Sequence, residues 1–61
     1  MLQKIIDDFI KYMEDHKLKQ GKAAELVQIS RPHLNKVING KETPSMALLM
    51  RMEEVMNGKL R

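Results

Sequence analysis

Apolar residues recur at helical spacing in four segments of this chain, and short polar stretches separate the segments. In residues 2–16 they recur at steps of three and four: Leu2, Ile5, Ile6, Phe9, Ile10 and Met13. This spacing predicts an amphipathic helix with one buried stripe. Its charged residues lie largely on the opposite face, and neighbouring carboxylates on a helix do not face each other. We therefore expect a structural helix without a catalytic role.

The next two segments are shorter and follow each other closely. Residues 20–27 and 32–39 each predict a helix with one apolar face. A connection of about three residues makes two helices cross steeply instead of lying antiparallel. Ala24 is small enough for the helices to approach each other there, and Ile29 is placed to fill the corner beneath both. The two segments therefore predict a helix-turn-helix.

The last segment, residues 44–56, is apolar nearly all round its circumference. Its apolar residues are Met46, Ala47, Leu48, Leu49, Met50, Met52, Val55 and Met56. We expect Leu49, Met52 and Met56 to face the core, because these three are enough to complete it.

A chain of 61 residues has a thin core, near the size at which a partner subunit helps folding. The remaining large apolar residues of segment 44–56 suggest where such a subunit would bind. We expect Leu48, Met50 and Val55 to supply a homodimer interface. The length also predicts a single domain over residues 1–61.

The chain has no cysteine, no long apolar run and no signal-peptide pattern. We therefore expect a cytoplasmic protein that does not enter a membrane. His16 and His33 are far apart in sequence and have no obvious third ligand, so no metal site is expected. Nothing in the sequence suggests catalytic residues or a cofactor, and an enzyme is not expected.

The net charge of +3 is unevenly distributed. Residues 16–41 hold one acidic residue, Glu25, and six basic ones: Lys17, Lys19, Lys22, Arg31, Lys36 and Lys41. The positive charge therefore coincides with the predicted helix-turn-helix, as expected of a surface that binds phosphates. The alternative is an ordinary solvated lysine face.

Twelve residues of this region form a pattern that extends beyond the two helices: Leu18, Gln20, Ala24, Ile29, Ser30, Leu34, Val37, Asn39, Gly40, Lys41, Pro44 and Ser45. With this pattern, residues 18–56 resemble the phage-repressor and Cro-like helix-turn-helix family, which also includes small antitoxin-type regulators. The resemblance implies a compact all-α domain of four helices, without the fifth helix usual in the family. Gln28 stands at a turn position where the family usually has Gly, and a positive φ would cost about 1 kcal/mol there.

The second helix of the motif carries the residues expected to contact bases. They are Arg31, Pro32, Asn35 and Lys36. Arg31 and Lys36 suit guanine, Pro32 suits a thymine methyl, and Asn35 suits adenine or a phosphate. Because Pro32 disfavours the α conformation at the residue before it, we expect this helix to begin at Pro32.

A further set is expected to contact phosphates, largely by resemblance to the family: Lys19, Gln20, Lys22, His33, Asn39, Lys41 and Thr43. Gly40 is expected to end the recognition helix in the left-handed conformation. Thr43 has a second interpretation as the N-cap of a helix that begins with Pro44.

These features predict a sequence-specific regulator that binds double-stranded DNA as a dimer. The expected target is a palindromic operator with half-site centres about 34 Å apart, or a multiple of that distance. Repression and autoregulation would suit a small phage or plasmid regulator. Two alternatives remain: an antitoxin-like protein whose main ligand is a partner protein, and a helix-turn-helix module that has lost DNA binding.

Overall fold

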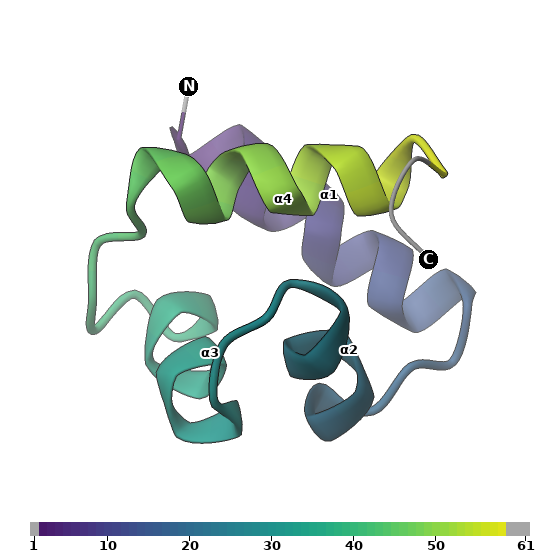
Figure 1. Ribbon diagram of the computed structural model, residues 1–61, viewed down its shortest axis with the longest axis horizontal. Coiled ribbons are helices and arrows are strands. Elements are labelled where there is room, and N and C mark those ends of the chain that lie inside the picture. Colours follow the sequence, from purple (N-terminus) through teal and green to yellow (C-terminus); the bar gives the residue numbers. More distant parts are fainter. Residues whose placement is uncertain (1, 59–61) are drawn as a thin grey trace.

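The computed structural model describes residues 2–58, which form four α-helices and no strand (Figure 1). The helices are α1 (Leu2–Asp15), α2 (Gln20–Leu26), α3 (Arg31–Ile38) and α4 (Met46–Met56). The predicted all-α fold is confirmed. Helices α1, α2 and α3 each end one residue earlier than predicted, at Asp15, Leu26 and Ile38.

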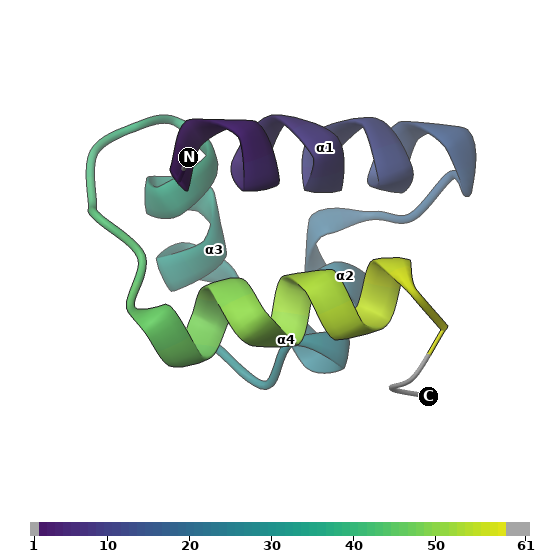
Figure 2. The same ribbon diagram turned by 90° about the horizontal axis from the view of Figure 1, so that it is seen from above.

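The helices form two layers. Helices α1 and α4 lie side by side and run in the same general direction, and α2 and α3 lie together beneath them (Figures 1 and 2). The most extensive contact is between α1 and α4, followed by that between α2 and α3. The upper layer therefore supports the helix-turn-helix from one side and leaves the opposite side of α2 and α3 open to solvent.

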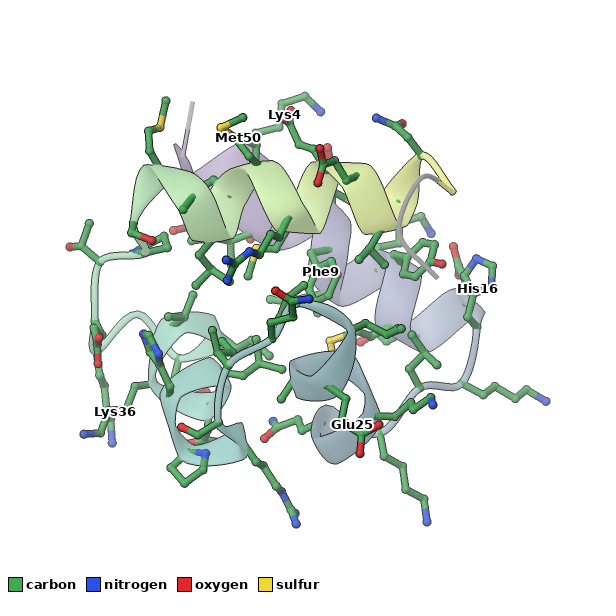
Figure 3. All side chains as sticks on the ribbon, viewed as in Figure 1. Lys4, Phe9, His16, Glu25, Lys36 and Met50 are labelled. Atoms are coloured by element: carbon green, nitrogen blue, oxygen red, sulfur yellow. The ribbon has the colours of Figure 1, made fainter. Side chains whose placement is uncertain are left out.

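All four helices contribute to one core. Its largest fully buried side chains are Phe9, Val27, Leu34, Val37 and Met52. Figure 3 shows Phe9 between the two layers. Ala23 and Ala24 are buried, and Leu18 and Ile29 are half-buried against the core. Ala24 and Ile29 were both expected to lie against the core of the helix-turn-helix, and this expectation is confirmed.

The face that helix α4 turns to the core is wider than predicted: Leu49 and Met52 are buried as expected, and neighbouring positions join them. Leu48, Leu49, Met52 and Val55 are all buried, and Met56 is half-buried. The expectation that Leu48 and Val55 face outward is wrong. At 3.6 residues per turn, the four buried positions span about a third of the helix circumference. Because α4 lies across both α1 and the layer beneath, this whole arc is covered.

Helix α3 begins at Arg31, one residue earlier than predicted. Ser30 is its N-cap, and the Ser30 hydroxyl accepts a hydrogen bond of 3.2 Å from the backbone N–H of His33. This bond satisfies one of the free amides at the helix start. It offsets the unfavourable effect of Pro32 on Arg31.

Helix α4 begins at Met46, two residues later than predicted. Its N-cap is Ser45, whose hydroxyl accepts a hydrogen bond of 3.1 Å from the backbone N–H of Leu48. The prediction that Thr43 caps this helix is wrong. Pro44 lies before the helix and is buried, so its ring packs in the loop instead of occupying the first helical position.

Each of the four helices is followed by one residue in the left-handed conformation. These residues are Lys17 (φ 57°), Gln28 (φ 63°), Gly40 (φ 76°) and Gly58 (φ 77°). After the first three, the next amide donates to a carbonyl five residues earlier, at 2.8–3.0 Å; the pairs are Leu18 to Met13, Ile29 to Ala24 and Lys41 to Lys36. The expectations for Gln28 and Gly40 are confirmed, whereas Lys17 was not foreseen.

Candidate nucleic-acid interface

The four predicted base-contacting residues lie together on the exposed side of α3. Arg31, Pro32, Asn35 and Lys36 are all exposed, and with Gln20 they line a hollow of about 460 Å³. We call this hollow the recognition hollow. In Figure 3, Lys36 points outward from α3 at the left margin of the molecule, below the level of α4. The structure therefore gathers these side chains on the open side of the helix-turn-helix.

A hydrogen bond joins the two helices across the recognition hollow. Asn35 Nδ2 donates to Gln20 Oε1 at 3.3 Å. The bond orients both amides, yet Asn35 retains its carbonyl oxygen and one N–H, and Gln20 retains its NH₂ group. The pair can therefore present further donors and an acceptor to a base edge or a phosphate.

A second hollow, of about 430 Å³, lies next to the first. It is lined by Lys17, Leu18, Lys19, Gly21, Lys22 and Arg31, and we call it the lysine hollow. Arg31 lines both hollows, so the two are adjacent at the start of α3. The predicted phosphate contacts Lys19 and Lys22 lie in this second hollow.

Ion pairing leaves much of the positive charge on the α2–α3 side without a partner. On α1, Lys4 pairs with Asp8 at 3.2 Å and Lys11 with Asp15 at 3.8 Å. On α2, Lys22 Nζ lies 3.7 Å from Glu25. Within residues 2–58 we find no ion pair for Lys17, Lys19, Arg31, Lys36 and Lys41. Their charge remains available to a polyanion.

His33 has a partner that the sequence analysis missed. Its Nε2 lies 3.0 Å from Glu42 Oε2, and both side chains are partly exposed. The pair ties α3 to the loop that follows it. The sequence contains one hint, an acidic residue within an otherwise basic and polar stretch. Glu42 competes with a phosphate for His33, so His33 is a weaker candidate for a phosphate contact than the lysines.

The remaining predicted phosphate contacts lie on the other side of α3. Asn39 is the C-cap of the helix, and Asn39, Lys41 and Thr43 are exposed in the loop after it. Thr43 lines a third hollow, of about 230 Å³, together with Gln3 of α1. The phosphate set is thus divided into two groups that flank α3, an arrangement suited to the two backbones beside a major groove.

The structure assigns neither histidine to a metal site. Residues 2–58 contain no group of three or more potential metal ligands. The ring of His16 lies 4.1 Å from that of Tyr12.

Within residues 2–58, no helix has the length and apolar character needed to cross a membrane.

Comparison with known proteins identifies the family to which the chain belongs. Residues 10–61 match the sequence profile of a family described as helix-turn-helix. The chain belongs to this family, and it is a DNA-binding transcriptional regulator in the general sense that the family defines. Searches of curated proteins and of solved structures found no match. The narrower resemblance to phage repressors and Cro-like proteins stays a prediction.

Proposed function

We propose that the protein binds a palindromic operator as a homodimer and represses transcription in the cytoplasm. The observation that supports this proposal best is the recognition hollow, where four side chains of α3 and Gln20 of α2 lie together on one exposed surface. Such a surface offers donors for base edges, and positive charge surrounds it. A small regulator of this kind would suit autoregulation of a phage or plasmid gene.

In this proposal, α3 enters the major groove with its N-terminal end deepest. Arg31 and Pro32 occupy the first turn, and Lys36 lies about one turn further along. Arg31 would contact guanine in a bidentate manner, which is worth about 1–3 kcal/mol of discrimination. Asn35, held by Gln20, would contact an adjacent adenine.

The two groups of basic and polar residues that flank α3 would bind the DNA backbones. Lys19, Gln20 and Lys22 lie before α3, and Asn39 and Lys41 lie after it. Phosphate contacts on both sides would fix the orientation of α3 in the groove without reading sequence. Because each contact releases counterions from the duplex, affinity should fall steeply with salt.

The position of Met50 constrains the proposed dimer. Figure 3 shows Met50 on the outer side of α4, whereas Lys36 points outward from α3 in the other layer. A two-fold pair through Met50 would direct the two α3 helices away from each other. An operator-bound dimer needs both α3 helices on the same duplex. We therefore propose a dimer whose interface lies on a lateral surface of the domain. This flank lies between the outer side of α4 and the open side of α3.

Selection of bound sites from a randomised duplex pool tests the proposal. The expected result is a two-fold symmetric site with half-site centres about 34 Å apart, or a multiple of that distance, and with a steep salt dependence. An enriched site without symmetry would contradict the dimer. No enrichment at all would contradict sequence-specific DNA binding.

The second candidate function is binding of a partner protein. It is supported by Met46 and Met50, the exposed large apolar residues of the described chain, at 70% and 56% exposure. They are four residues apart and so share one face of α4. Methionine packs adaptably against partners. The same selection distinguishes the two functions, because a protein whose main ligand is another protein would enrich no site or only a weak one.

A further inference from the structure

The lysine hollow gathers positive charge from three segments of the chain. Lys17 and Lys19 come from the link between α1 and α2, Lys22 comes from α2, and Arg31 comes from α3. Leu18 and Gly21 complete its lining. Four cations around one hollow of about 430 Å³ repel one another unless an anion lies between them.

Neighbouring acidic groups do little to neutralise this charge. Within residues 2–58, the one ion pair that involves any of the four cations joins Lys22 to Glu25 at 3.7 Å, and those side chains are 62% and 75% exposed. An exposed pair of this kind is weak. Glu14 and Asp15 lie three and two residues before Lys17, but the contact between Lys17 and Glu14 is a backbone one, N to O at 3.2 Å. Within residues 2–58 the ammonium of Lys17 has no acidic partner.

Lys17 also has an unfavourable backbone conformation. Its φ of 57° allows the amide of Leu18 to donate to the carbonyl of Met13 at 2.8 Å, which ends α1. Glycine or asparagine is usual at such a position, and a residue with a larger side chain costs about 1–2 kcal/mol there. A costly residue that lines a hollow rich in cations suggests a use for its side chain.

We propose that the lysine hollow binds a phosphodiester of the DNA backbone and that Lys17 is a DNA contact. This inference rests on the proposed function and extends the interface beyond the residues predicted from sequence. Because Arg31 lines both hollows, this phosphate belongs to a nucleotide beside the bases that α3 reads. Lys17 and Lys19 would bind it with charge-assisted hydrogen bonds, while Arg31 contacts the neighbouring base.

The first test compares Lys17→Gln with Lys11→Gln on the selected operator. Both variants lose one positive charge, but Lys11 lies on α1 and pairs with Asp15. The slope of log affinity against log salt should decrease in magnitude by about 1 for Lys17→Gln. It should be unchanged for Lys11→Gln, and Lys17→Arg should retain the wild-type slope. Equal slopes for Lys17→Gln and wild type would overturn the inference.

The variant Lys17→Gly separates loss of a contact from damage to the fold. Glycine relieves the left-handed strain, so the midpoint of thermal unfolding should rise. The salt slope should nevertheless decrease as it does for Lys17→Gln. A Lys17→Gly protein that is more stable and also keeps the wild-type slope would show that Lys17 contacts no phosphate.

Ethylation interference locates the phosphate. Ethylation of one backbone phosphate should weaken wild-type binding, and it should weaken Lys17→Gln binding by less, because only the contact from Lys19 remains to be lost. A separate titration tests whether the hollow binds a free anion instead. Inorganic phosphate is compared with chloride at equal ionic strength while amide chemical shifts are recorded. Saturable shifts around Lys17 that vanish in Lys17→Gln would overturn the backbone assignment in favour of a free anion.

A wild-type protein that binds no duplex would overturn the proposed function as well, whereas normal binding with an unchanged Lys17→Gln slope would overturn this inference alone.

Discussion

Asn35 of α3 donates a hydrogen bond of 3.3 Å from Nδ2 to Oε1 of Gln20, the first residue of α2. The bond crosses the open side of the helix-turn-helix, where Asn35 is exposed and Gln20 is half-buried. In water a bond of this kind contributes little to stability. Its consequence is orientation, since it fixes which groups of both amides face a bound duplex.

If this orientation matters for binding, substitutions of the two residues should not be additive. We expect a double-mutant cycle of Gln20→Ala and Asn35→Ala, measured as operator affinity, to give a coupling energy of about 0.5–3 kcal/mol. The control cycle pairs Gln20→Ala with Lys41→Ala, from the loop after α3. That pair should be additive within about 0.5 kcal/mol. Additivity in both cycles would show that the two amides act independently.

Arg31→Ala should remove specificity and leave general DNA affinity. Arg31 is exposed at the first position of α3, so its guanidinium can reach a guanine edge. We expect the operator to be bound about 1–3 kcal/mol more weakly, with weak binding to unrelated duplexes retained. Competition titrations with operator and scrambled duplexes measure both. An equal loss on every sequence would place Arg31 on a phosphate.

Gln28→Gly should stabilise the protein. Gln28 is exposed with φ 63°, a conformation that glycine adopts without strain. The gain should be about 0.5–1 kcal/mol, measured as a shift in the urea midpoint at constant slope. The matched reverse change is Gly40→Ala. A Cβ at Gly40 would meet nothing within 4 Å, so its cost of about 1 kcal/mol would come from φ 76° alone. A stability loss in Gln28→Gly would contradict the strain argument.

Ser45→Ala and Thr43→Ala distinguish the true cap of α4 from the predicted one. The Ser45 hydroxyl accepts the N–H of Leu48, and its loss should cost about 1 kcal/mol. Thr43 is exposed and lies outside the helix, so Thr43→Ala should change stability by less than about 0.5 kcal/mol. Urea unfolding of the two variants measures the difference. A larger cost for Thr43→Ala would restore Thr43 as the cap.

The error over Thr43 shows what local pattern leaves open. Thr43-Pro44 and Ser45-Met46 are both acceptable helix starts, and each satisfies the preference for a hydroxyl residue at the N-cap. Burial of Pro44 decides between them, and that burial depends on how the loop packs against the other helices. Sequence pattern alone does not contain this packing.

The width of the buried face of α4 was mispredicted, at Leu48 and Val55, for a related reason. The periodicity of α1 identifies its buried face, because Ile6, Phe9 and Met13 alternate with charged residues. Helix α4 is apolar nearly all round its circumference, so the periodicity of its sequence does not identify which face is buried. Leu48 is buried and Met50 exposed because of where α1 and the lower layer lie. By contrast, the polar face of α3 was predictable, since Leu34 and Val37 leave one possible buried side.

The glutamate at position 42 was missed because a contact between a helix and the following loop leaves no periodic signal. His33 and Glu42 are nine residues apart, and the left-handed turn at Gly40 brings them to 3.0 Å. The sequence could indicate that turn but not the direction in which the loop continues. The same limit applies to Lys17, whose left-handed conformation has no glycine or asparagine to mark it.

Met50→Glu should leave the protein folded and its operator affinity unchanged. Met50 is 56% exposed, so a charge there should alter stability by no more than about 0.5 kcal/mol. It lies on the outer side of α4, whereas Lys36 projects from α3 in the other layer, where the duplex is proposed to bind (Figure 3). Leu48→Ala is the contrasting change two positions earlier, since Leu48 is 2% exposed and its truncation should cost about 2–5 kcal/mol. Such a loss approaches the whole stability of a small domain.

Sedimentation and operator titration of Met50→Glu then decide where the dimer interface lies. A symmetric dimer that binds its operator normally despite the glutamate would support an interface on the flank. A folded monomer with weakened operator binding would place the interface on the outer face of α4. That result would also show that two copies joined at Met50 can direct both α3 helices to one duplex, contrary to the geometry of the single chain.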